Sequence, residues 1–136
     1  MKNNLKIALA QLNPIVGDVK GNIIKLIDIR NNLKDEVDII VAPELYVTGY
    51  PIDDLVLRND FLELVENEIN ILAKITNDGK AAIVLGAPRK EKNSIRNSVF
   101  VLDDGKITSF RDKHNLPNSG VFDEQRIFSP GALSGP

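Results

Sequence analysis

The stretch IIVAPELYVTGYPIDDL, residues 39–55, joins an apolar run to a carboxylate and a Gly-Tyr-Pro turn. An uninterrupted run such as Ile-Ile-Val-Ala is typical of a strand that is covered on both faces of a sheet. Pro43 ends the run and Glu44 follows it directly. In α/β proteins, binding sites form beyond the carboxyl ends of the strands. Glu44 is therefore either a partly desolvated general base or an ordinary loop glutamate that faces water or caps a helix.

Strand and helix patterns alternate along the rest of the chain. The sequence predicts buried strands at 5–13, 37–42 and 81–88, amphipathic helices at 19–36 and 59–78, a short helical turn at 54–58, and a hairpin at 95–113 around Asp104-Gly105. Residues 114–136 are rich in Pro and Gly and show little periodicity. This order predicts the α/β class, in layers, with a sheet that begins parallel and continues antiparallel.

Composition excludes several kinds of partner and site. The 136 residues are enough for one domain, and the net charge of −2 argues against nucleic acid or an anionic membrane as partner. The longest basic cluster, at 89–96, contains a glutamate and is expected to be a solvated loop. No apolar run approaches the roughly 18 residues of a membrane span, and the N-terminus lacks the features of a signal peptide. We therefore expect a cytoplasmic protein.

Two further side chains raise the question of chemistry. Lys113 follows the second strand of the hairpin, where it could either stabilise an oxyanion or lie on the surface. His114 is the only histidine and has no serine at a catalytic spacing, so we expect it to be structural or close to substrate. There is no cysteine, which removes thiolate metal sites, and we expect no metal centre. The glycines match no phosphate-binding loop.

Four stretches together resemble a known family. They are LAQLNPIVGDVKGN, VAPELYVTGYPIDDL, GAPR and RDKHNLPNSGVFDEQRIFSPG, and they resemble the nitrilase, or carbon–nitrogen hydrolase, superfamily. Within it, TGYPIDDL and KHNLPNSGVFDEQRIF resemble the glutaminase domain of glutamine-dependent NAD⁺ synthetases. The resemblance implies a four-layer α-β-β-α sandwich. It also implies that residues 1–136 are a single, truncated domain, incomplete at the C-terminus and without the synthetase domain.

The resemblance implies a Glu–Lys–Cys triad acting on glutamine. Glu44 matches the general base and Lys113 the lysine that stabilises the oxyanion, while Glu124 is a candidate for an accessory glutamate. Tyr50 falls where that branch holds glutamine, and Ser119 stands where it commonly has a tyrosine that covers the substrate. Because both triad residues of this chain end strands, we expect them to meet at one edge of the sheet.

The family reaction needs a cysteine thiolate, and this sequence has none. In the family, ammonia from glutamine passes to a separate domain, which uses ATP and Mg²⁺ to amidate nicotinic acid adenine dinucleotide. We expect this chain to need no cofactor, to be inactive alone, and to form a homo-oligomer. The alternatives are a degenerate, non-catalytic module for binding or oligomerisation and a truncated amidase of another nitrilase branch. A truncated domain should expose a sheet edge and part of an apolar face.

Overall fold

The structure is a computed structural model that describes residues 4–133. Its elements are β1 (Ile7–Leu9), α1 (Val19–Leu33), β2 (Ile39–Val41), the 3₁₀ helix η1 (Asp53–Leu57), α2 (Asn59–Lys74), β3 (Ala82–Glu91), β4 (Ser94–Asp103), β5 (Lys106–Asp112) and α3 (Glu124–Ile127). The strands form one sheet in the order β1-β2-β3-β4-β5. The first three strands are parallel and the last two are added antiparallel, which confirms the predicted class.

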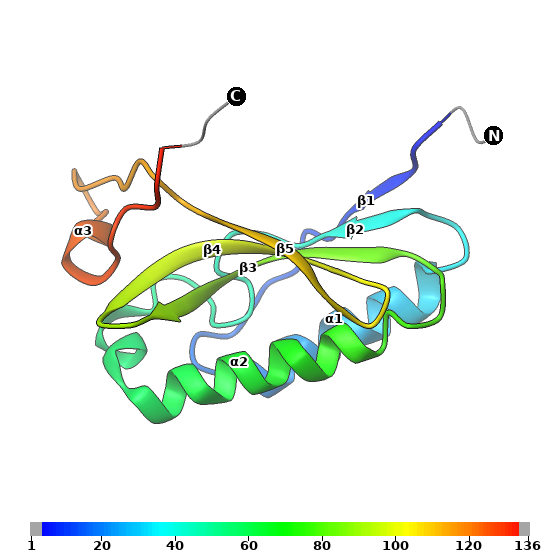
Figure 1. Cartoon of the computed structure of the whole chain (residues 1–136), viewed down its shortest axis with the longest axis horizontal. Coiled ribbons are helices and arrows are strands. Elements are labelled where there is room, and N and C mark those ends of the chain that lie inside the picture. The colour runs from blue at the N-terminus through cyan, green and yellow to red at the C-terminus, as the bar shows by residue number, and fades with distance from the viewer. Residues whose placement is uncertain (1–3, 134–136) are drawn as a thin grey trace.

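Both long helices cover the same face of the sheet (Figure 1). Asp18 caps α1 by accepting the N–H of Gly21, and the apolar stripe of α2 faces inward. The core lies between this pair of helices and the sheet, where Ile83 and Leu85 of β3 are fully buried. The structure therefore contains two of the four layers that the resemblance implies, one of helices and one of strands.

The opposite face of the sheet is largely bare among the described residues. Residues 5–13 were predicted to be a buried strand, and this is wrong in two respects. The strand is only Ile7–Leu9, and the side chains of Ile7 and Leu9 are 50 % and 73 % exposed. Its apolar composition fits a strand covered on both faces, but β1 is an edge strand and the helices cover only one face. The expected exposed edge and apolar face are thus present.

Residues 89–96 are not a solvated loop but the end of a hairpin. Arg89 pairs with Arg96 across β3 and β4, and Glu91 pairs with Ser94. The Glu91 carboxylate accepts hydrogen bonds from both arginines, at 3.2 Å and 3.0 Å. The Glu91 carboxylate offsets the repulsion between the Arg89 and Arg96 side chains. These two basic residues can therefore lie opposite each other on paired strands.

An arginine ties the helix layer to the start of β3. The Arg30 side chain of α1 is buried, and it donates to the backbone carbonyls of Ala81 and Ile75 and to both carboxylate oxygens of Asp78. The hydrogen bond from Arg30 holds the pKa of Asp78 well below its ordinary value. A buried guanidinium with all its partners in place fixes how α1 sits against the loop that leads into β3.

Candidate active site

Glu44 lies on a turn that folds back onto β3. The N–H of Gly86 donates to the carbonyl of Pro43, and the N–H of Val47 donates to the carbonyl of Gly86. A Cβ atom at Gly86 would lie 2.4 Å from the backbone nitrogen of Leu45, so only glycine allows this approach. Leu45 itself has a φ of 51°, a left-handed conformation that costs free energy and is most frequent at functional turns.

The residues after Glu44 are anchored in the core. The Tyr46 hydroxyl donates to the backbone carbonyl of Asn22 at 2.8 Å, and burial raises the pKa of Tyr46 to about 12. The Asn22 side chain in turn donates to the carbonyls of Val47 and Ile15. The buried hydrogen bonds of Tyr46 and Asn22 therefore anchor the turn that carries Glu44 to the core.

Lys113 follows β5 and meets Glu44 across the sheet. Its Nζ donates to Glu44 Oε1 at 2.7 Å and to Glu124 Oε1 at 3.2 Å. Its backbone is fixed on both sides, because the N–H donates to the carbonyl of Asn97 and the carbonyl accepts the N–H of Gly131. The structure thus brings together the three residues that the sequence analysis proposed as catalytic, at the carboxyl-terminal ends of β2 and β5.

Charge pairing keeps the lysine protonated. Burial acts to lower the pKa of Lys113, but the hydrogen bonds and charges of Glu44 and Glu124 outweigh it, so the pKa is raised. The Lys113 side chain is 30 % exposed and that of Glu44 is 53 % exposed. About half of the Glu44 side chain is therefore shielded from water, and the rest is exposed on the bare face of the sheet. Its role as general base stays a prediction.

Glu124 is buried although it lies on a four-residue helix. Its side chain is 5 % exposed, and its Oε2 has no hydrogen-bond partner among the described residues. That atom lies 3.1 Å from Lys113 Nζ, which makes an ion pair, but the direction is not that of a hydrogen bond. Buried carboxylate oxygens are normally satisfied. Glu124 Oε2 therefore marks a position where an N–H or O–H donor would be stabilised.

Ion pairs hold α3 in place beside the site. Arg126 of α3 contacts Asp54 of η1 and donates to Asp123 at 2.8 Å. These contacts connect the segment after Lys113 to the segment after Tyr50. This connection between two loops that lie far apart in the sequence positions Glu124.

The two residues expected to hold substrate are placed differently. The Tyr50 ring lies 6.4 Å from that of Phe122, and burial, together with the charges of Glu124 and Glu44, raises the pKa of Tyr50. Tyr50 is thus within electrostatic reach of the three charged residues. Ser119 lies on an exposed turn, where its carbonyl accepts the N–H of Phe122. Within residues 4–133, the hydrogen bonds of the charged cluster do not include Ser119. Its role stays a prediction.

Sequence reasoning missed one residue of this site. Asn97 of β4 is buried, and its Nδ2 donates to Glu44 Oε1 at 2.6 Å. The only signal for it was a polar amide within a strand of alternating apolar residues. His114 lies beside the site but has another role, because its Nδ1 is 2.7 Å from the carbonyl oxygen of Gly131 and holds the returning chain.

The charged cluster opens into a hollow on the bare face of the sheet. This hollow has a volume of about 390 Å³ and is lined by Val41, Val84 and Val99 as well as by Glu44, Asn97 and Lys113. Apolar walls with a few convergent polar groups are typical of sites for small molecules.

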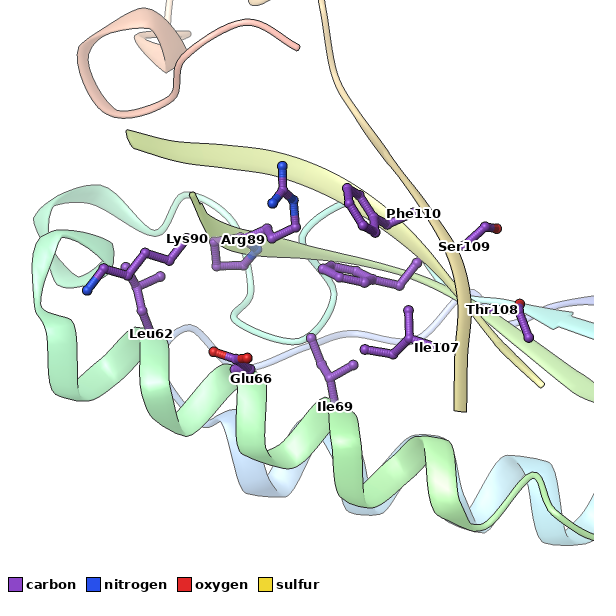
Figure 2. A pocket seen from close by; sticks show the side chains of 11 residues that line it. Leu62, Glu66, Ile69, Arg89, Lys90, Ile107, Thr108, Ser109 and Phe110 are labelled. Carbon is purple, nitrogen blue, oxygen red and sulfur yellow. The ribbon is translucent and has the colours of Figure 1, made fainter. Parts of the chain in front are cut away.

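A larger hollow of about 640 Å³ lies between α2 and the edge strand β5 (Figure 2). Arg89 lines this hollow and forms an ion pair with Asp112, with 2.7 Å between the guanidinium nitrogen and the carboxylate oxygen. Its Cζ lies 4.4 Å from the centre of the Phe110 ring. Neither Glu44 nor Lys113 lines this larger hollow, so the candidate site is the smaller one.

Residues 4–133 offer neither a metal site nor a membrane span. No group of three or more His, Cys, Asp or Glu side chains there is arranged to hold a metal ion. No helix in the same range is both long and apolar enough to cross a membrane.

The comparison with known families covers almost the whole sequence. The family model of the carbon-nitrogen hydrolases matches residues 6–135. The chain belongs to the carbon–nitrogen hydrolase family. This membership confirms the resemblance read from the motifs around Glu44 and Lys113.

Individual relatives place this carbon–nitrogen hydrolase chain within one branch. It is 38 % identical, over 128 residues, to a glutamine-dependent NAD(+) synthetase of Thermotoga maritima, covering 93 % of this chain and 22 % of that protein. The solved glutamine-dependent NAD⁺ synthetase of Acinetobacter baumannii superposes with a TM-score of 0.85 at 36 % identity, covering 95 % and 24 %. The chain matches the N-terminal glutaminase portion of such proteins and spans about a quarter of their length.

A more distant neighbour supports the fold alone. An amidase from Nesterenkonia sp. superposes with a TM-score of 0.80 at 18 % identity, covering 97 % of this chain and 50 % of the amidase. The arrangement of sheet and helices is thus that of the nitrilase-like sandwich, present here in part.

Proposed function

We propose that this chain supplies the general base, the oxyanion-stabilising lysine and the accessory glutamate of a site that hydrolyses glutamine. The observation that carries the proposal is the position of Lys113 Nζ, which bonds to Glu44 Oε1 and Glu124 Oε1 at once. The similarity to glutamine-dependent NAD(+) synthetases supports glutamine as the substrate. The sequence has no cysteine, so in this proposal the thiol comes from outside the 136 residues.

The proposed reaction uses Glu44, Lys113 and the thiol from outside the 136 residues. Glu44 accepts the thiol proton, and the thiolate attacks the side-chain amide carbon of glutamine. The carbonyl oxygen becomes an oxyanion, which the Lys113 ammonium stabilises. The C–N bond then breaks as Glu44 returns the proton to the leaving nitrogen, which departs as ammonia. Water, deprotonated by Glu44, attacks the thioester and releases glutamate and the thiol.

The ammonia is used elsewhere in this proposal. A synthetase domain outside these residues would consume ATP, with Mg²⁺, and amidate nicotinic acid adenine dinucleotide. The present chain would hold no cofactor of its own, and without a cysteine it would release no ammonia when alone.

A chimeric enzyme tests the proposal directly. Residues 6–131 would replace the matching segment of the Thermotoga maritima synthetase, which retains its own cysteine and synthetase domain. We expect glutamine-dependent ammonia release, and we expect Glu44→Gln or Lys113→Met to reduce kcat by about 10²–10⁴-fold. The exposed residues Glu63 and Lys106 provide matched controls, Glu63→Gln and Lys106→Met.

NAD⁺ synthesis from added ammonia shows whether the chimera is folded. A chimera that uses ammonia but releases none from glutamine would contradict the proposal. Equal loss of activity in the control variants would contradict the roles assigned to Glu44 and Lys113.

A second candidate function rests on the bare face of the sheet. Ile7, Leu9 and Val99 are exposed apolar side chains on that face. A non-catalytic module would use them to bind a second copy of the chain, which would make it a homo-oligomer. Sedimentation of the purified chain tests the module: a monomer, or a dimer that Leu9→Lys leaves intact, would argue against it.

A further inference from the structure

Asn97 contacts both members of the Glu44–Lys113 pair from one position on β4. Its side-chain Nδ2 lies 2.6 Å from Glu44 Oε1, and its backbone oxygen accepts the N–H of Lys113 at 2.7 Å. Its side chain is 3 % exposed, which is unusual for an amide unless its hydrogen bonds are made. A buried residue thus fixes the distance between an acid and a base that lie 69 positions apart in the sequence.

The hydrogen bonds are distributed unequally over the Glu44 carboxylate. Oε1 accepts from Asn97 at 2.6 Å and from Lys113 Nζ at 2.7 Å, which occupies both of its lone pairs. Among the described residues, every hydrogen bond to this side chain goes to that oxygen. The lone pairs of Oε2 remain available, so a proton is accepted there more readily than at Oε1.

An amide suits this position better than the alternatives of similar size. It donates to the carboxylate without carrying a charge, so it does not compete with Lys113 as the counter-ion. An aspartate would have the same shape but would offer only acceptors to Glu44, and a leucine would fill the volume but offer no donor. The neighbouring Ser98 is also buried but binds Asp112 at 2.6 Å, on the other face of the strand.

We propose that Asn97 is a positioning residue that occupies Glu44 Oε1 and so assigns Oε2 as the oxygen that accepts and returns the proton. This inference rests on the proposed glutamine hydrolysis. Asn97 does not touch the reacting atoms; it acts through the orientation of Glu44 and through the backbone of Lys113.

The first experiment observes the hydrogen bond in the 136-residue chain by NMR. One side-chain amide proton of Asn97 should resonate downfield and exchange slowly with water. Glu44→Gln should shift that proton, whereas the control Glu63→Gln should leave it unchanged. An Asn97 amide that exchanges as fast as those of exposed asparagines would overturn the proposal without any reference to activity.

The second experiment measures glutamine hydrolysis in the chimera described above. We expect Asn97→Leu to lower kcat by about 10–100-fold with KM changed less than about twofold, because a hydrogen bond to a charged group is lost from the base and not from the substrate. Asn97→Asp should lower kcat further, and the acidic limb of its pH–rate profile should move. The control Ser98→Ala should keep both constants and the profile.

The outcomes separate the two proposals. If the chimera is active and Asn97→Leu keeps kcat within twofold, the role of Asn97 is wrong and the proposed function stands. If the folded chimera releases no ammonia, both are wrong. NAD⁺ synthesis from added ammonia excludes misfolding as the cause of a loss, and Asn97→Ser, a smaller residue that keeps a donor, should recover part of the kcat lost in Asn97→Leu.

Discussion

The two faces of the sheet differ in what they contribute. The face under α1 and α2 is closed, with Ile40, Ile83 and Leu102 fully buried and Arg30 locked into its hydrogen bonds. The other face is open, with exposed leucine and valine side chains and the Glu44–Lys113 pair beside them. Most of the buried core therefore lies on one face and the proposed site on the other, and substitutions should separate the two.

The largest effect should come from the closed face. Arg30→Met removes four hydrogen bonds and leaves the Asp78 carboxylate without its main partner. The carbonyls of Ala81 and Ile75 lose a buried donor. Asp78 is 29 % exposed and keeps Lys34 as a partner. We expect the lost charge-assisted hydrogen bonds to cost about 3–5 kcal/mol of the free energy of unfolding. Urea unfolding measures this loss.

The control for Arg30→Met is Lys20→Met, since Lys20 is an exposed residue of α1 whose nearest carboxylate oxygen is 4.0 Å away. It should change the unfolding free energy by less than about 0.5 kcal/mol. The spectrum of the Lys113 side chain should be unchanged in any folded fraction of Arg30→Met. A displaced Lys113 would show that the faces are coupled.

Gly86→Ala should affect both faces, because it lies at the point where the Glu44 turn contacts β3. The added methyl group would meet backbone atoms of Glu44 and Leu45, which cannot rotate away. We expect a loss of about 1–3 kcal/mol in unfolding free energy together with a displaced Glu44 carboxylate. Calorimetry and the NMR signals of Glu44 and Lys113 measure the two parts.

Gly79→Ala provides a matched comparison for Gly86→Ala. Nothing lies within 4 Å of a Cβ atom at Gly79, although its φ of +66° disfavours alanine. It should lower stability through backbone strain alone and leave the signals of the Glu44–Lys113 pair in place. If the NMR signals of Glu44 and Lys113 in Gly86→Ala matched those of the wild type, the turn would not depend on this close approach.

The smallest effect is the pH dependence of stability. It should appear at alkaline pH for Lys113 on the open face and at acid pH for Asp78 of the closed face. The pKa of Lys113 is raised above its ordinary 10.5, so its ion pairs add stability below pH 10.5 and lose it as pH rises through the folded value. The pKa of Asp78 is lowered from 3.8, so its stabilisation is present above pH 3.8 and is lost as pH falls.

Unfolding free energies measured from pH 2 to 12 test this assignment. Lys113→Met should flatten the alkaline slope. It also leaves the buried Glu124 carboxylate without its counter-ion, so we expect a further loss of unfolding free energy at neutral pH. Asp78→Asn, the control, should flatten only the acid side. A change on the wrong side would contradict the division between the faces.

Local patterns predicted most of the elements. The hairpin turn at Asp104-Gly105 and the helix beginning at Asn59 are where the sequence placed them, because turn chemistry and a 3.6-residue stripe are local properties. The exposure of β1 was not predictable in this way. A pattern of apolar residues indicates that a strand can be covered, but burial also requires a second layer.

The site was predictable to the extent that its residues end strands or belong to motifs. Glu44 and Lys113 follow strands, and the structure brings them within 2.7 Å. Asn97 was missed because its function depends on which strand lies beside which, and no local signal carries that register. The helix α3, which buries Glu124, is too short to show a periodic pattern.

The segment from His114 to Pro130 leaves the sheet at Lys113 and returns beside it. The N–H of Gly131 binds the carbonyl of Lys113, the imidazole of His114 binds the carbonyl of Gly131, and the N–H of Ser129 binds the carbonyl of Ile95. These hydrogen bonds hold both ends of the segment against the sheet. Such a segment can change in length and in its exposed side chains while the backbone of Lys113 keeps its place, as long as Glu124, which bonds to Lys113 Nζ, is retained.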